Sequence, residues 1–111
     1  MDIQPRKNLT EDAFGAIAQR FRLLSDPLRL RILHTLGNDE MTVGGLVDQI
    51  GGSQSNISKH LSLLLTHGIV YRRREGTSAF YSVADTSIFS LCDTVCGGID
   101  RDLENRRKAF Q

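Results

Sequence analysis

The fold of this 111-residue chain follows from one stretch, Gly51-Gly52-Ser53-Gln54-Ser55-Asn56-Ile57-Ser58-Lys59-His60-Leu61. The paired glycines predict a tight turn, because glycine adopts positive φ angles at no steric cost. Ser53 is a good N-cap, since its hydroxyl can accept a hydrogen bond from a free N–H of the first helical turn. Apolar residues then recur at helical spacing. These are Ile57, Leu61, Leu64 and Leu65. The stretch predicts a turn and an amphipathic helix that stops at Gly68.

The polar face of this predicted helix suits the major groove of DNA. Glutamine and asparagine amides can form paired hydrogen bonds with adenine edges, and a helix N-terminus offers free N–H groups to phosphates. A solvated, serine-rich helix start with no partner has the same composition, so both interpretations stay open on this segment alone. The candidate DNA-binding residues here are Ser53, Gln54, Ser55, Asn56, Ser58, Lys59 and His60.

Three helices are predicted before this stretch. Thr10, followed by two acidic residues, opens a helix that continues to about Leu24. Asp26 with Pro27 opens a second helix, which Gly37 stops. Thr42 caps a short third helix, and this helix with the next one has the spacing of a helix-turn-helix. The first helix carries an apolar stripe that needs a partner, made of Phe14, Ile17, Ala18, Phe21 and Leu24.

A β-hairpin is predicted after the amphipathic helix. The run 69–83 is rich in β-prone residues, and Gly76 marks the tip of the hairpin. Three arginines precede the tip, and strand alternation places Arg73 on the face opposite to Arg72 and Arg74. At most two of the three therefore face DNA together, and Arg72 and Arg74 are the candidates for contact with the phosphate backbone. The net charge is only +1, so any basic face is a local feature.

A last helix is predicted from a cap at Asp85 or Thr86. Its apolar stripe consists of Ile88, Leu91, Cys92, Val95, Ile99 and Leu103. Gly97 and Gly98 interrupt the stripe and predict a kink, an early end, or a close approach of two helices. The expected organisation is a flexible N-terminal arm (1–9), a DNA-binding and dimerisation domain (10–105) and a charged C-terminal tail (106–111). The predicted fold is mostly α-helical: five helices with a β-hairpin wing.

Composition excludes several classes of protein. With 40% hydrophobic and 24% charged residues, the chain is typical of a globular domain. No stretch approaches the roughly 20 apolar residues of a membrane span, so no membrane partner is expected. The first seven residues lack the apolar run of a signal peptide, and we expect a cytoplasmic protein. Gly51-Gly52-Ser53 lacks the lysine of a phosphate-binding loop and no nucleophile stands near a base, so an enzyme is not expected.

Three blocks of sequence together resemble the ArsR/SmtB family of winged-helix repressors. They are Leu24–Leu33, Ser53–Leu61 and Gly68–Tyr81, and the resemblance covers about residues 12–100. It implies a homodimer built from the first and last helices, with DNA bound by the helix of Ser53–Thr66. It also implies an inducible repressor that binds palindromic operator DNA and releases it when an inducer binds.

The known inducer sites of this family are not matched. Arsenite sensors often carry Cys-x-Cys in the third helix, where this chain has Thr42 and Gly44. Zinc sensors need histidines in the last helix, and this chain has none after His67. Persulfide sensors pair a last-helix cysteine with one in the second helix, where only His34 is available.

Cys92 and Cys96 remain as the candidate sensor. At i and i+4 they share one helix face, with Cβ atoms about 6 Å apart. Thiolates select soft metals and metalloids, so the pair predicts an inducer such as As(III), Sb(III) or another soft metal ion. Two other interpretations stay open: a thiol-redox or persulfide switch, and cysteines that only pack in the core. With structural cysteines, the chain could also be a winged-helix protein-interaction module. DNA binding itself requires no cofactor.

Overall fold

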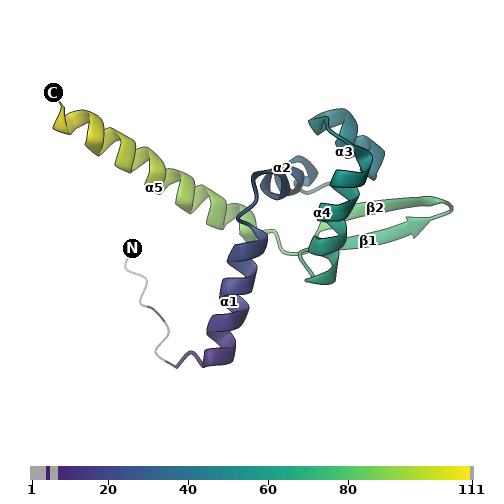
Figure 1. Ribbon diagram of the computed structural model, residues 1–111, viewed down its shortest axis with the longest axis horizontal. Helices are drawn as coiled ribbons and strands as arrows, with labels where there is room; N and C mark the ends of the chain where they lie inside the picture. Colours follow the sequence, from purple (N-terminus) through teal and green to yellow (C-terminus); the bar gives the residue numbers. More distant parts are fainter. Residues whose placement is uncertain (1–4, 6–7, 111) are drawn as a thin grey trace.

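Within residue 5 and residues 8–110, which the computed structural model describes, five helices and one antiparallel hairpin follow the predicted order (Figure 1). Most of the arm expected at residues 1–9 lies outside the described residues. The elements are α1 (Glu11–Leu23), α2 (Pro27–Leu36), α3 (Val43–Ile50), α4 (Gln54–Thr66), β1 (Val70–Glu75), β2 (Ser78–Val83) and α5 (Ser87–Ala109). The predicted winged helix-turn-helix is confirmed.

Side-chain caps begin the first four helices where the sequence predicts them. Thr10 Oγ1 accepts from the N–H of Ala13 at 3.1 Å, and Thr42 Oγ1 from Gly45 at 3.0 Å. Asp26 Oδ1 accepts from the N–H groups of Leu28 and Arg29, and Ser53 Oγ from that of Asn56. Each cap satisfies a backbone donor that the helix cannot pair internally. The caps fix where α4 begins, and so which of its side chains reach the surface.

The core lies between α2, α3, α4 and the hairpin. Its fully buried side chains are Ile32, Leu33, Leu36, Leu46, Ile57, Leu61, Leu64, Ile69 and Val70. The N–H groups of Met41 and Tyr81 each donate to the other's carbonyl, which joins the segment before α3 to β2. Apolar residues of α4 are therefore held in the core while its polar face points outward.

The hairpin forms the wing. Glu75 pairs with Ser78, so the turn consists of Gly76 and Thr77, and Gly76 adopts a φ of 61°. This left-handed conformation favours glycine, and the predicted tip is confirmed. Figure 1 shows the hairpin projecting from the body formed by α2, α3 and α4.

Helices α1 and α5 extend away from this body (Figure 1). Both leave apolar side chains exposed. Phe14 and Phe21 in α1 are about half exposed, as are Val95, Ile99 and Leu103 in α5. Burying such a large apolar surface is favourable at about 25 cal/mol per Å². Leu24 and Ile88, which belong to the two predicted stripes, are buried in the core. The five exposed side chains are not covered by any of the described residues.

The last helix runs from Ser87 to Ala109 without interruption. An early end at Gly97-Gly98 is therefore not observed, and residues 106–109 of the expected tail belong to the helix. Asp85 Oδ1 accepts from the N–H and the hydroxyl of Ser87, whereas Thr86 makes no side-chain cap bond. A Cβ atom at Gly97 would lie 3.4 Å from Nη1 of Arg101, an ordinary contact with the end of a flexible side chain. None of the helices in the described part of the chain is long and apolar enough to cross a bilayer.

Candidate nucleic-acid interface and cysteine pocket

The first turns of α4 present polar side chains to solvent. Burial of Ile57 and Leu61 fixes the rotation of the helix and turns the opposite face outward. The exposed candidates are Ser53, Gln54, Ser55, Asn56 and Lys59, whereas Ser58 and His60 are half-buried. The structure therefore brings five of the seven α4 candidates to one accessible helix start, where amides and free N–H groups can meet base edges and phosphates.

His60 faces α2. Its Nδ1 lies 3.3 Å from Nη1 of Arg29, a residue 31 positions earlier in the sequence. Arg29 also donates to the carbonyls of Leu23 and Arg22 at the end of α1. Sequence reasoning missed Arg29, because a single arginine in the first turn of a helix carries no local sign of such distant partners.

Asp26 supports the same region from the loop between α1 and α2. Hydrogen bonds from the backbone N–H groups of Arg29 and Leu28 lower the pKa of its carboxyl below the usual value, and the nearby His60 and Arg29 side chains act in the same direction. The carboxylate therefore stays ionised and keeps the first turn of α2 capped.

The wing arginines divide as strand alternation predicts. Arg73 Nη2 donates to Oε1 of Glu40 at 2.6 Å, its Nη1 to Glu75 at 2.7 Å, and its guanidinium carbon lies 4.7 Å from the centre of the Phe80 ring. Hydrogen bonding to Arg73 lowers the pKa of Glu40, and both carboxylates raise the pKa of Arg73. Arg72 and Arg74 lie on the other face, exposed and without an ion pair among the described residues. Their charges are available to a polyanion.

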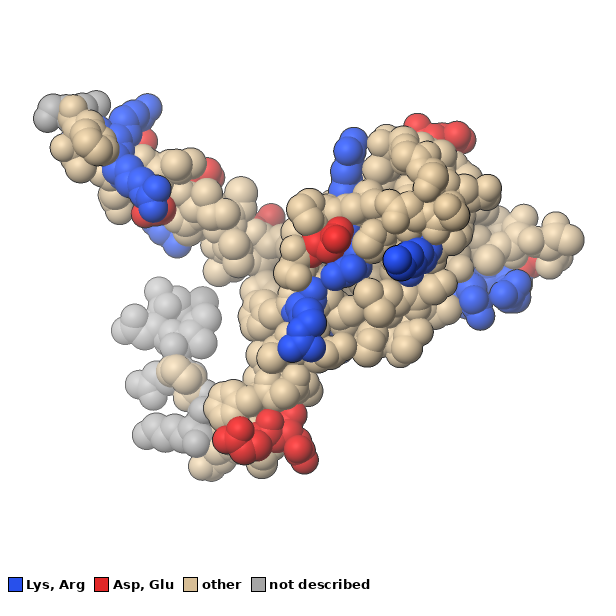
Figure 2. Space-filling view, in the orientation of Figure 1, with Lys and Arg blue, Asp and Glu red and all other residues tan. Residues whose placement is uncertain are grey.

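Figure 2 shows how the charges distribute on this side of the molecule. Lysine and arginine side chains lie over α1, around α2 and α4, along the hairpin and on α5. Acidic groups lie at α3, on α5 and at one place in the middle of this face, and they gather at the start of α1. Glu11 and Asp12 are the acidic residues of that first turn. Several basic side chains therefore lie around α4, although the net charge of the chain is small.

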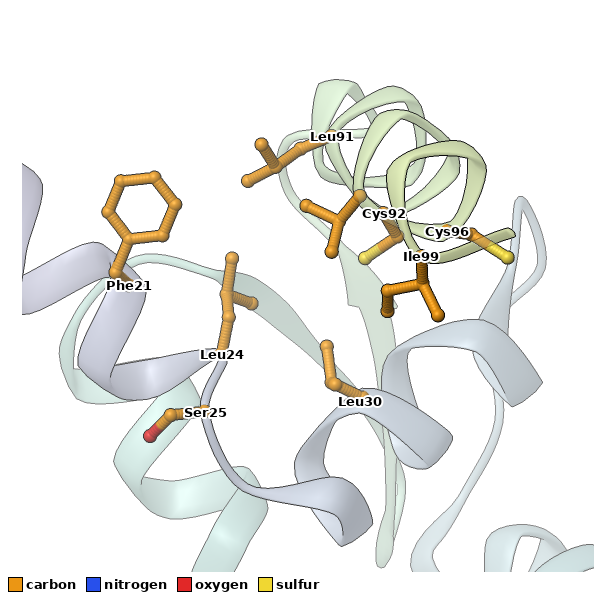
Figure 3. Close-up of a pocket in the computed structure, with 9 residues that line it drawn as sticks. Phe21, Leu24, Ser25, Leu30, Leu91, Cys92, Cys96 and Ile99 are labelled. Atoms are coloured by element: carbon orange, nitrogen blue, oxygen red, sulfur yellow. The ribbon is translucent and has the colours of Figure 1, made fainter. Parts of the chain in front are cut away.

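A second feature is a cavity of about 500 Å³ between α1, α2 and α5 (Figure 3). Its lining is apolar apart from one hydroxyl and two thiols, and consists of Phe21, Leu24, Ser25, Leu30, Leu91, Cys92, Val95, Cys96 and Ile99. Cys92 is half-buried, Cys96 is exposed, and both are free thiols. In Figure 3 the two sulfur atoms point to different sides of α5. A single ion bound by both would require a thiol to change its rotamer.

The donor set fits a soft ion better than a hard one. Among the described residues, no group of three or more His, Cys, Asp or Glu side chains could hold a metal. Within one chain, a metalloid or soft metal at this pocket would thus have only the two thiolates as strong ligands. Thiolate pairs suit As(III), Sb(III) and similar ions, whereas an oxygen-seeking cation such as Mg²⁺ has no carboxylate in the pocket lining.

Comparisons with known proteins agree with this architecture. A helix-turn-helix domain family matches residues 24–73. The transcriptional regulator KmtR of Mycobacterium tuberculosis is 32% identical over 83 residues, 75% of this chain and 64% of KmtR. A probable mercury resistance operon repressor of Streptomyces lividans is 40% identical over 74 residues, 67% of this chain and 59% of that repressor. The chain therefore spans less than two thirds of these two relatives.

Other relatives are covered more fully. A transcriptional repressor SmtB homolog of Synechocystis is 33% identical over 89 residues, 80% of this chain and 67% of the homolog. The crystal structure of M. tuberculosis Rv0081 superposes with a TM-score of 0.74 at 33% identity, covering 87% of this chain and 98% of Rv0081. The homodimeric winged helix-turn-helix domain of Mycobacterium bovis Mb0332, a possible ArsR-family regulator, superposes with a TM-score of 0.73 at 26% identity over 93% of this chain and 95% of that domain. The chain belongs to the ArsR/SmtB family of winged helix-turn-helix DNA-binding transcriptional regulators.

Proposed function

We propose that this protein is a homodimeric repressor that binds palindromic operator DNA and releases it when a thiophilic inducer binds at Cys92 and Cys96. The observation that carries the DNA-binding part is the exposed polar start of α4 beside a wing with two exposed arginines, Arg72 and Arg74, which form no ion pair with the described residues. The proposed site of action is the cytoplasm, where DNA is accessible and thiols stay reduced.

The dimer is supported by the apolar stripes of α1 and α5. Helix α1 exposes Phe14, Ile17 and Phe21, and helix α5 exposes Val95, Ile99 and Leu103. A monomer would leave this surface in water, and the similar domain of Mb0332 is described as homodimeric. A twofold dimer presents two α4 helices to DNA, so the operator should be a palindrome with half-sites about one helical turn apart.

The inducer site is supported by the cysteine pocket. Phe21, Val95 and Ile99 belong both to the pocket lining and to the exposed stripes, so an occupant of the pocket touches the surfaces that set the shape of the dimer. A soft ion held by thiolates there can favour a dimer that no longer fits the operator, to the extent that it binds that dimer more tightly. The relative from S. lividans is named a mercury resistance repressor, which agrees with a thiophilic inducer.

One observation favours a second candidate for the trigger. The sulfur atoms of Cys92 and Cys96 point apart, and Cys96 is exposed. An exposed thiol can be oxidised or persulfidated without a partner in the same chain. A thiol-redox or persulfide-responsive repressor would use the same helix and the same dimer surface.

Duplex binding tests the repressor function directly. Fluorescence anisotropy should show binding of the reduced protein to a duplex from its own promoter, at an affinity that falls steeply as salt rises. A scrambled duplex of equal length should bind more weakly. Salt-insensitive association with another protein, without any duplex binding, would instead identify a protein-interaction module.

The inducer is tested by titration of the reduced protein with arsenite, antimonite and Hg²⁺. Thiolate coordination produces ultraviolet charge-transfer absorbance, and we expect saturation at one ion per Cys92/Cys96 pair. Cys92→Ser and Cys96→Ser should each reduce that absorbance. Operator release by peroxide or a persulfide donor, with no response to any of the ions, would support the redox trigger instead.

A further inference from the structure

Arg29 joins three helices through one guanidinium group. Its Nε donates to the carbonyl of Leu23 at 2.7 Å, and its Nη2 donates to that of Arg22 at 3.3 Å. Its Nη1 lies 3.3 Å from Nδ1 of His60. The residue is half-buried in the first turn of α2, so its side chain spans from the end of α1 to the middle of α4.

The chemistry of this bridge is specific to arginine. The Leu23 carbonyl accepts from Arg29, whereas the Arg22 carbonyl also accepts from the N–H and the hydroxyl of Ser25. Both carbonyls lie at the negative end of the dipole of α1, so a cation is favourable there. A guanidinium has donors only, arranged in a rigid fork. The Nδ1 of His60 must therefore accept, which fixes neutral His60 as the tautomer with its proton on Nε2. A lysine at position 29 would keep the charge but could not make all three contacts.

The two ends of the bridge lie beside the two functional features of the molecule. At one end, Leu24 and Ser25 follow directly after the Leu23 carbonyl and line the cysteine pocket. At the other end, His60 follows Lys59, an exposed cation of α4, the helix proposed to read DNA. A cavity of about 430 Å³ lies on the surface of α4 and is lined by Arg29 from α2 together with α4 residues that include Lys59 and His60. The side chain of Arg29 thus borders a cavity on α4 as well as bridging to His60.

We propose that Arg29 is a positioning residue for α4, the helix proposed to read DNA. It fixes the position of α4 relative to the end of α1, and so couples discrimination of the operator to the residues that line the cysteine pocket. The inference rests on the proposed repressor function, because the register of α4 matters only if α4 reads DNA. In this role Arg29 acts on DNA binding through its contact with His60 and does not itself contact a phosphate.

Salt dependence separates these two roles. A residue that neutralises a phosphate contributes about one unit to the slope of log affinity against log salt, and its loss weakens all sequences equally. Arg29→Gln should leave that slope unchanged if the residue positions α4. Discrimination between operator and scrambled duplex should fall about tenfold in Arg29→Lys, within the range found for coupled neighbours. Uniform weakening with a reduced slope in Arg29→Gln would overturn the proposal.

Two matched controls and a double-variant cycle sharpen the test. Arg31→Lys changes an exposed arginine on the same helix, and Gln19→Ala removes a side-chain contact between α1 and His67, the residue that follows α4. Both should discriminate like the wild type. His60→Leu should lose discrimination and add nothing to Arg29→Lys, because the two residues form one contact. Additive losses would contradict the bridge.

A readout in the free protein keeps the inference testable without DNA. Nitrogen-15 NMR in alkaline buffer should find His60 as the Nε2–H tautomer, and Arg29→Lys should weaken this preference and speed amide exchange in the first turns of α4. A wild-type Nδ1–H tautomer, or unchanged exchange in the variant, would refute the bridge whatever the DNA result. If the wild type binds no operator while the tautomer is as expected, the proposed function fails and the bridge stands.

Discussion

Arg73 and Glu40, 33 residues apart, are joined by two hydrogen bonds: Nη2 to Oε1 at 2.6 Å and Nε to Oε2 at 3.2 Å. This fork-to-fork contact fastens the wing to the segment before α3. It also occupies the middle arginine of the wing, whereas Arg72 and Arg74 have no ion pair among the described residues.

The Glu40 contact should make the wing sensitive to acid. Hydrogen bonding to Arg73 lowers the pKa of Glu40, so its contribution is complete above the unfolded-state pKa and is lost as pH falls through the folded-state value. Amide exchange in the hairpin should be slower in wild type than in Glu40→Gln at neutral pH. The difference should disappear in acid. A gap that stays constant down to low pH would contradict this account.

Arg72→Ala and Arg74→Ala should each weaken binding to operator and scrambled duplex alike. Each change removes a charge available to phosphate, so the salt slope should fall by about one unit per variant. Lys108→Ala, near the end of α5, makes the same change in net charge away from the wing. Its binding curve should match the wild type, and an equal loss in this control would show only a general effect of net charge.

Gln54→Ala should relax sequence preference while leaving scrambled-duplex affinity nearly unchanged. Its amide lies at the exposed start of α4, and a paired contact to a base edge carries about 1–3 kcal/mol of discrimination. Competition assays with single-base operator variants measure this at each position. Gln49→Ala on α3 is the matched control, and a uniform loss in Gln54→Ala would assign the residue to phosphate contact.

Local patterns in the sequence were enough to predict much of this fold. Ser53, Asp26 and Thr42 act as caps where expected, because a cap depends only on neighbours within one helical turn. The alternation of the three wing arginines follows from strand geometry alone. These features were enough to predict which face of α4 is exposed and which side of the wing carries Arg72 and Arg74.

Contacts between distant segments could not be predicted in this way. The approach of Arg29 to His60 and of Arg73 to Glu40 depends on how the helices and the hairpin pack, which no local pattern contains. The course of α5 was also undetermined, since glycine costs only about 1 kcal/mol in a helix and the packing of neighbours can outweigh it. The structure excludes an early end, because α5 continues through both glycines.

Ile99→Asp should convert the dimer to a monomer. Ile99 is 55% exposed on α5, and a carboxylate there would be buried without a partner if the stripe forms the interface. Sedimentation at micromolar concentration measures the mass, and circular dichroism should show retained helix content. Tyr71→Asp alters an equally exposed apolar residue on the wing and should stay dimeric. A dimeric Ile99→Asp protein would move the interface elsewhere.

Operator release by a soft ion is the measurement that tests the central claim most directly. Reduced wild type, Cys92→Ser and Cys96→Ser are bound to the same operator duplex and titrated with antimonite, arsenite or Hg²⁺ while anisotropy is followed. All three proteins should bind the duplex equally, because neither cysteine lies on α4 or the wing. Wild type should lose at least about tenfold in affinity, equivalent to about 1.4 kcal/mol of coupling, while both serine variants keep theirs. Normal release from either serine variant would contradict the assignment of Cys92 and Cys96 as the inducer site.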